Sequence, residues 1–356
     1  MVLGSVLLRR GTEFVAEMKD KDQQPDIKIA GWLAALVVLS VVVFFVLAGA
    51  IEYTYGWVVP TLAAVEQTDP DLYVRIDTDP DANKSADPNA PEPEDIFRPA
   101  PVTRSLRSTL RHLRSRGGFR SRFRGFSMAL LCMAAPGFIT AFFPFAVASS
   151  FLGQFAINMV VAVLTANLQM AWVHIVISEP SSKRFYQRIP SLRDWNRIVP
   201  VAVFEYAVTL GAFYLPMMVT CGFSGLDDPA NFDIRTSGAY ARAAASFSGP
   251  ALLSFLVSIP ARAIFVRVAA SMLPEDHEAI VPFDRSFGGK VVPAILGGSG
   301  KLGIADAWRT FDRAARIRYV KAIAKGFAIM FAFAFVYVAA LCAVLISGGV
   351  KFGDKA

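Results

Sequence analysis

Residues 30–66 read AGWLAALVVLSVVVFFVLAGAIEYTYGWVVPTLAAVE, and before the final Glu66 they hold one charged side chain, that of Glu52. The hydrocarbon core of a bilayer takes about 20 apolar residues of helix to cross. This block is longer than one crossing requires, so we expect a membrane helix that tilts or kinks. A cleaved signal peptide does not fit, because a charged lead of 29 residues precedes the block.

The rest of the chain has the same apolar character. Of its 356 residues, 54% are hydrophobic and 18% are charged, whereas soluble domains carry about 25% charged residues. Five more apolar blocks of membrane-spanning length follow, at 127–152, 155–178, 197–224, 247–273 and 325–348. The expected fold is therefore an all-α membrane protein with six transmembrane helices.

Basic residues are divided unequally between the two ends of these helices. An even number of crossings puts both termini on one side and the loops 67–126, 179–197 and 274–326 on the other. These loops carry 25 Lys and Arg residues, and the terminal side carries 9. The positive-inside rule therefore predicts that the three loops face the cytoplasm or the mitochondrial matrix.

The first of these loops has two parts. Residues 68–102 are rich in Pro, Asp and Glu, which predicts a disordered linker that is available to a protein partner, although composition alone names none. From Thr103 on, arginines recur at helical spacing beside a stripe of leucines, which predicts a basic amphipathic helix on the membrane surface. The residues of this pattern are Arg104, Arg107, Arg111 and Arg114, with Leu106, Leu110 and Leu113. Membrane headgroups explain it with fewer assumptions than a nucleic acid, so no nucleic-acid partner is expected.

Three blocks end alike, which indicates an internal repeat. The endings are VVPTLAAVEQ (58–67), TANLQMAWVHIVISEP (165–180) and SIPARAIFVRVAASMLP (258–274). Pro60 and Pro260 remove a backbone donor and should kink their helices, and Asn167 takes the corresponding place in the second unit. We predict three helix pairs related by a pseudo-threefold rotation, with these three residues at equal depth.

Two loops finish on a basic residue, Gly and Phe, at Arg124-Gly125-Phe126 and at Lys325-Gly326-Phe327. Glycine accepts backbone conformations that other residues avoid, so each Gly is predicted to turn the chain from a surface helix into the next span. The second of these surface helices is expected at 303–319.

The repeat divides the chain into five parts. A polar tail (1–29) precedes the first repeat (30–152), which contains the acidic linker. The second repeat (153–224) has a shortened loop, and Gly153-Gln154 allows only a tight turn before it. The third repeat (247–348) is followed by a short tail (349–356).

With these features the chain resembles the mitochondrial carrier family, the solute carrier 25 family, over most of residues 30–345. That family has three repeats of two helices, each with a surface helix on the matrix side. RGGFRSRFRGF (116–126) resembles the family's loop ending, and GIADAWRTFDRAARIRYVKAIAKGF (303–327) resembles its third surface helix and ending. The resemblance implies transport of a solute across a mitochondrial membrane, inner or outer.

The chain departs from the family at the charged positions of the odd helices, where the family has Pro-x-acid-x-x-base. The acid position holds Leu62, Gln169 and Arg262, and the paired basic position holds Val65, Trp172 and Phe265. These residues cannot form the interhelical ion pairs that close the matrix gate in the family. A carrier with this sequence must close its gate by hydrogen bonds and packing, or it does not cycle.

Ionisable side chains at membrane depth are costly unless they are paired or hydrated, so they are candidates for a site. The candidate substrate-binding or gating residues are Glu52, Gln169, His174, Glu205, Arg262 and Arg267. In one interpretation Glu205 and Arg262 face water in a central cavity as a binding or gating pair. In the other, His174 and Arg267 lie at the interface, and Glu52 or Glu205 belongs to a structural pair.

Two functions remain after this survey. No nucleophile–base set, carboxylate dyad or metal-ligand spacing is visible, and the three cysteines lie far apart, so we expect no enzyme, no cofactor and no metal. The first function is transport of a small metabolite, with basic loops that would attract anions and anionic lipid such as cardiolipin. The second is that of a degenerate carrier that no longer transports and serves as a scaffold for membrane insertion, fusion or complex assembly.

Overall fold

The computed structural model describes residues 31–67, 101–144, 147, 150–224, 237–292 and 296–347. Regular structure in these ranges is helical, with one isolated bridge between Ser178 and Ala279. Six of the helical segments are long and apolar enough to cross a membrane. The prediction of an all-α protein with six membrane helices is confirmed at this level. The two tails and nearly all of the acidic linker lie outside the described residues.

The helices of the described ranges are named in chain order. They are α2 (Gly31–Ile51), η1 (Glu52–Val58), α3 (Val59–Val65), η5 (Val102–Arg104), α4 (Leu106–Gly117), η6 (Phe119–Phe123), α5 (Phe126–Thr140), α7 (Phe151–Ile177), η7 (Phe185–Arg188), α8 (Leu192–Ser224), α9 (Ser237–Ser271), α10 (Ile304–Arg309) and α11 (Arg313–Ser347). One of them, η1, is a π-helix that leads directly to Pro60, and the other η elements are 3-10 helices.

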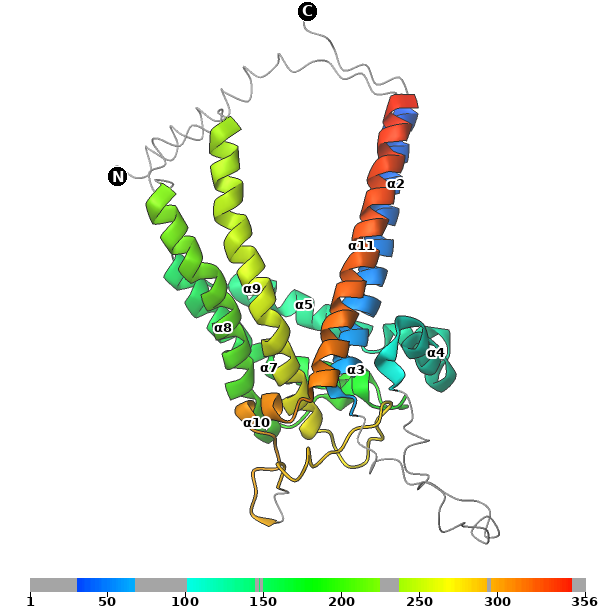
Figure 1. Cartoon of the computed structure of the whole chain (residues 1–356), viewed down its shortest axis with the longest axis vertical. Coiled ribbons are helices and arrows are strands. Elements are labelled where there is room, and N and C mark those ends of the chain that lie inside the picture. The colour runs from blue at the N-terminus through cyan, green and yellow to red at the C-terminus, as the bar shows by residue number, and fades with distance from the viewer. Residues whose placement is uncertain are drawn as a thin grey trace, which may run out of the picture. The chain divides into compact units, whose positions relative to one another are not determined.

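The described residues form two compact units, one of residues 31–51 with 328–347 and one of the described residues between 52 and 327. In the first unit, α2 and the second half of α11 lie side by side (Figure 1). The Phe44 ring stacks on Phe333 and on Tyr337, with centroid distances of 5.3 and 4.1 Å. Large apolar side chains such as Phe45 and Phe335 are exposed, which suits helices that face lipid.

In the second unit, α7, α8 and α9 pack side by side in chain order, and α5 packs against α7 (Figure 1). The segments that follow Pro60, Asn167 and Pro260 also converge, because α3, α7 and α9 contact one another in all three pairings. Alanines such as Ala64 and Ala263 are fully buried there. Small side chains let membrane helices approach closely, so the sequence makes this end of the unit the tightly packed one.

The basic amphipathic helix predicted from Thr103 is present as α4. It begins after Ser105, whose hydroxyl accepts a hydrogen bond from the backbone N–H of Ser108 at 3.1 Å and caps the helix. Thr109 and Leu113 are buried against the core. The four arginines of the pattern are exposed, so α4 presents a basic face to its surroundings.

The second apolar block does not form one helix up to residue 152. Its helix α5 ends at Thr140, and α7 already begins at Phe151. The turn expected at Gly153-Gln154 is therefore wrong, since both residues lie in the first turn of α7. Ser150 explains the difference, because its side chain accepts the Gly153 N–H at 3.0 Å and caps α7.

The third surface helix is also shorter than predicted. Only α10 precedes a break at Thr310–Asp312, and α11 then runs from Arg313 to Ser347 without interruption. Asp312 sets this boundary, because its carboxylate accepts the Ala314 N–H at 3.1 Å in the manner of an N-cap. The turn predicted at Lys325-Gly326 is therefore wrong, since both residues are inside α11.

The other glycine predicted to turn the chain, Gly125, does so. Gly125 has φ of +74°, a left-handed conformation, and it is the N-cap residue of α5. Its neighbour Arg124 donates from Nε to the Ile175 carbonyl at 3.1 Å and from Nη2 to the Ser178 carbonyl. A guanidinium on the last carbonyls of α7 is favourable, because the C-terminal end of a helix carries partial negative charge.

Gly326 has a different role, which leads to a first prediction. A Cβ at this position would lie 2.9 Å from the Tyr55 carbonyl oxygen, so Gly326→Ala should cost about 1–3 kcal/mol through overpacking. Gly137→Ala is the control, since a Cβ there meets nothing within 4 Å and alanine is the better helix former. Melting in detergent should show a lower midpoint for the first variant only. Equal midpoints would contradict the close approach at Gly326.

Candidate functional site

A group of polar side chains connects three of the membrane helices in the second unit. Arg262 of α9 donates from Nη1 to the Gln169 Oε1 of α7 at 2.9 Å. The same nitrogen lies 3.3 and 3.4 Å from the two carboxylate oxygens of Glu205 on α8. The structure therefore brings together three of the six residues that the sequence predicted for a site. Their positions are 57 and 93 residues apart in the chain, so only the packing of α7, α8 and α9 makes them neighbours.

The amide of Gln169 is held in one orientation. Its Nε2 donates to the Thr165 hydroxyl and to the Tyr206 hydroxyl, each at 3.2 Å. Thr165 in turn donates to the carbonyl of Val161 at 2.7 Å. Because the amide nitrogen is committed to these hydroxyls, its oxygen points to Arg262. Sequence reasoning missed Thr165 and Tyr206, which carry no charge and lie in apolar helices.

Aromatic rings flank the Arg262 guanidinium. Its Cζ lies 5.0 Å from the centroid of Phe265 and 5.7 Å from that of Trp172. These distances are within the range of cation–π attraction. The Arg262 side chain is nevertheless 30% exposed and that of Glu205 is 13% exposed. The pair is thus fixed by its neighbours, and part of the Arg262 side chain is exposed.

The other predicted site residues lie outside this group. Glu52 is exposed on η1. His174 is buried and makes a hydrogen bond of 2.8 Å between Nε2 and the Ala269 carbonyl, which joins α7 to α9. Arg267 is buried with 1% exposure and binds backbone carbonyls. His174 and Arg267 therefore do not lie at the interface with extended side chains, as one interpretation of the sequence had it.

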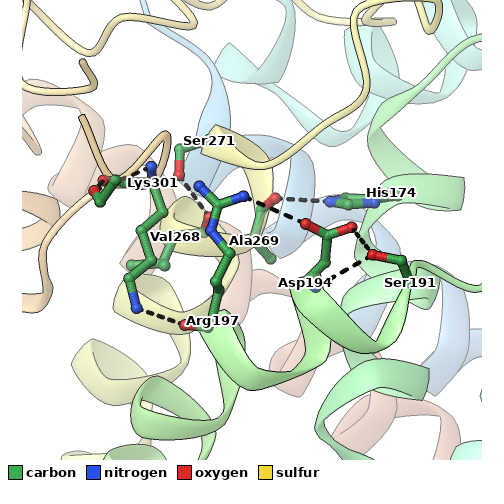
Figure 2. Close-up of polar contacts among 9 residues, drawn as sticks. His174, Ser191, Asp194, Arg197, Val268, Ala269, Ser271 and Lys301 are labelled. Carbon is green, nitrogen blue, oxygen red and sulfur yellow. Dashed lines mark hydrogen bonds and ion pairs between the residues drawn. The ribbon is translucent and has the colours of Figure 1, made fainter. Parts of the chain in front are cut away.

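Figure 2 shows a second group of polar contacts, at the C-terminal ends of α7 and α9 and the N-terminal end of α8. α8 begins at Leu192, five residues before the predicted 197. Ser191 precedes this first turn, and its hydroxyl donates to the Asp194 carboxylate at 2.7 Å. Lys301 donates to the Arg197 carbonyl at 2.6 Å (Figure 2). Burial lowers the pKa of Lys301, and the positive charge of Arg197 lowers it further.

A buried carboxylate that the sequence analysis passed over organises the start of α4. Glu66, fully buried, accepts the backbone N–H groups of Val102 and Thr103 at 2.5 and 2.9 Å, and also the Thr103 hydroxyl. It lies 36 residues before Val102 in the chain. Its position at the end of an apolar helix was the available signal, but the partner could not be read from the sequence.

The described residues contain no group of three or more His, Cys, Asp or Glu side chains that could hold a metal ion. Cys132 and Cys342 are free thiols. The side chain of Cys221 lies outside the described residues.

Comparisons with known proteins add no relative, because no protein family, curated protein or solved structure matches this chain. The fold therefore defines the class: six apolar helices of spanning length are those of an integral, multi-pass membrane protein. A charged pair and its amide partner lie within these helices.

Proposed function

We propose that this protein is a membrane transporter of a small metabolite that is built like a mitochondrial carrier and acts in a mitochondrial membrane. The observation that carries the proposal is the accessible Arg262–Glu205 pair, held between three apolar helices by Gln169. Ionisable residues at membrane depth mark solute pathways when they face water. The Arg262 side chain is 30% exposed, so the pair is not fully enclosed by the helices that hold it.

The residues at the carrier gate positions support this proposal by their packing. Leu62, Val65 and Phe265 are fully buried and Trp172 nearly so, all in one core cluster. Gln169 and Arg262, which both occupy the acid position of the repeat, bind each other directly. Where the family uses ion pairs between gate positions, this chain has buried apolar side chains and one hydrogen bond between two of these positions. Such a gate layer closes the passage by packing, and it opens only if the three helices separate.

A second set of equivalent positions, Gln67, His174 and Arg267, also reaches across between repeats. Arg267 binds the Ala64 carbonyl of α3, and His174 binds Ala269 of α9. The Gln67 side-chain oxygen accepts the Asp284 N–H at 2.7 Å. These bonds link the third repeat to the first and to the second, and none of the three joins the first repeat to the second.

The basic loops support a lipid partner within the same proposal. A groove of about 300 Å³ lies along α4 and η6, and its lining includes Arg111, Arg114 and Arg122. The Arg122 guanidinium lies 3.9 Å from the centroid of the exposed Phe119 ring. Clustered arginines beside apolar side chains suit the phosphate headgroup of an anionic lipid such as cardiolipin.

A degenerate carrier that acts as a membrane scaffold is the second candidate. The observation that favours it is the same buried gate layer, because Leu62, Val65 and Phe265 offer no ion pairs that could re-form during a transport cycle. A scaffold needs only the closed state. The two functions therefore differ in whether solute crosses the membrane.

Reconstitution into liposomes tests the choice. We expect exchange of at least one metabolite from a panel of amino acids, carboxylates and nucleotides above the empty-vesicle level. Arg262→Gln and Glu205→Gln should each reduce the rate by about 10–100-fold, which corresponds to one lost charged hydrogen bond. Glu275→Gln, the same change on an exposed loop residue, is the control and should leave the rate unchanged.

Two results would count against transport. One is the absence of exchange by protein that elutes as a single folded species, which would support the scaffold. The other is equal exchange by wild type and both variants, which would remove the Arg262–Glu205 pair from the solute pathway.

A further inference from the structure

The hydrogen bonds of Arg262 all leave from one nitrogen, Nη1. Nε and Nη2 bond to no atom of the described residues, and neither belongs to the buried polar atoms that lack a partner. This edge therefore has no partner among the described residues, and its nitrogens are not completely enclosed. The Nε–Nη2 edge of a guanidinium presents two parallel donors that match the two oxygens of a carboxylate.

The charge balance of the site further restricts the chemical class of the ligand. Glu205 already neutralises Arg262, at 3.3 Å. A simple anion on the free edge would leave the site with a net negative charge at membrane depth, and a simple cation on Glu205 would leave it positive. Uncompensated charge is costly in this environment. A solute with one carboxylate and one ammonium group satisfies both partners and leaves the net charge at zero.

We propose that the Arg262–Glu205 pair is the binding site of a zwitterionic solute, with the carboxylate on the Nε–Nη2 edge of Arg262 and the ammonium group on Glu205. This inference rests on the proposed transport function and names its substrate class. It differs from the anionic solute that the basic loops favour, because those loops attract charge at the surface whereas the pair selects it inside the membrane. Trp172 and Phe265 support the site, because both rings lie within cation–π distance of the guanidinium.

The spacing of the two charges on the solute should matter. Glu205 contacts Nη1, and the free edge lies on the other side of the guanidinium. The carboxylate and ammonium groups of the solute must therefore be far enough apart to reach both. One member of a series of amino acids with increasing separation should bind best, and the longer and shorter members should bind less well.

Binding is measured by the thermal stability of the purified full-length protein in detergent, which does not require transport. The probes are glycine, β-alanine and γ-aminobutyrate, with acetate and methylammonium as single-charge controls. A ligand that binds only the folded state raises the melting temperature in a concentration-dependent way. We expect one zwitterion to bind at least tenfold more tightly than either single-charge probe.

The variants reverse the charge preference. Glu205→Gln leaves Arg262 uncompensated, so acetate should now bind more tightly than the zwitterion by about tenfold. Arg262→Gln leaves Glu205 uncompensated, so methylammonium should be preferred. Glu275→Gln should keep the preference of the wild type. Because the wild-type series alone tests the ordering, a variant that fails to fold does not remove the test.

The outcomes separate this inference from the transport function. Zwitterion binding without exchange in liposomes would support the site and contradict transport. Exchange of an anion with no stabilisation by any of the zwitterions would support transport and overturn the zwitterion site. Tighter binding of acetate than of every zwitterion by the wild-type protein would overturn it as well.

Discussion

Arg267→Met is expected to have the largest effect on stability of any substitution considered. Arg267 is 1% exposed, and its guanidinium donates to the carbonyls of Ala307, Ala64 and Thr310 at 3.0–3.1 Å. These acceptors belong to α10, to α3 and to the turn after α10. Methionine fills similar space but leaves the carbonyls buried without donors, at about 1–3 kcal/mol each. We expect a loss of about 5 kcal/mol.

The measurement is the melting temperature in detergent, together with the yield of monodisperse protein. A loss of this size corresponds to a decrease of roughly 10 °C or more in a chain of this length, and a failure to accumulate would be its extreme form. Arg309→Met is the matched control, because Arg309 is an exposed arginine on neighbouring α10. A decrease of only a few degrees for Arg267→Met would show that the three carbonyls find other donors.

Arg267→Lys separates charge from geometry. Lysine retains the positive charge, but its compact ammonium group cannot reach carbonyls that diverge around a planar guanidinium. The ring centroids of Phe287 and Phe311 also lie 4.9 and 4.8 Å from the Arg267 Cζ. A planar guanidinium can stack on such rings, whereas an ammonium group cannot. We therefore expect Arg267→Lys to be destabilised nearly as much as the methionine variant. Full stability of the lysine variant would mean that charge alone is required.

Glu66→Gln should release the start of α4. The Glu66 carboxylate receives only donors, from the N–H groups of Val102 and Thr103 and from the Thr103 hydroxyl. A glutamine must turn an NH₂ group towards one of these donors, which removes an acceptor and adds a repulsive contact. Hydrogen bonds to a charged group contribute about 1.5–3 kcal/mol, so most of the attachment of η5 should be lost.

Limited proteolysis with trypsin measures this release at the start of α4. The exposed Arg104 and Arg107 follow the attachment point, and cleavage there should become at least tenfold faster in Glu66→Gln than in the wild type. Thr103→Val removes one donor and leaves the two N–H groups, so it should accelerate cleavage less. Unchanged cleavage in Glu66→Gln would show that α4 is held in place without the Glu66 carboxylate.

Sequence reasoning failed where an element boundary depends on a single cap. Ser150 and Asp312 are short polar residues that begin α7 and α11, and both were absorbed into longer apolar or amphipathic patterns. Gly326 looked like a second Gly125, because the same three-residue pattern surrounds both. The packing of Tyr55 against Gly326 requires a small residue inside a helix, which produces the same sequence signal as a turn.

For the candidate site, the sequence identified some residues but not their contacts. Glu205 and Arg262 could be picked out in advance, because charged side chains are rare in apolar blocks and stand out by type. Their pairing could not, since it depends on how α8 and α9 rotate about their axes when they pack. Glu66 and Arg267 were harder still, because their partners are backbone groups, which every residue carries and no pattern reveals.

The sequence by itself determined that this protein has six helices of membrane-spanning length, because each span is one continuous run of apolar residues. It also singled out Glu205, Arg262 and Arg267 as charged side chains that had to find partners. Only the tertiary structure decided that Gln169 and Glu205 share Arg262, that one edge of this arginine stays open, and that Arg267 is enclosed by carbonyls. Each of these depends on contacts between residues far apart in the chain, whose distances are set by the packing of whole helices.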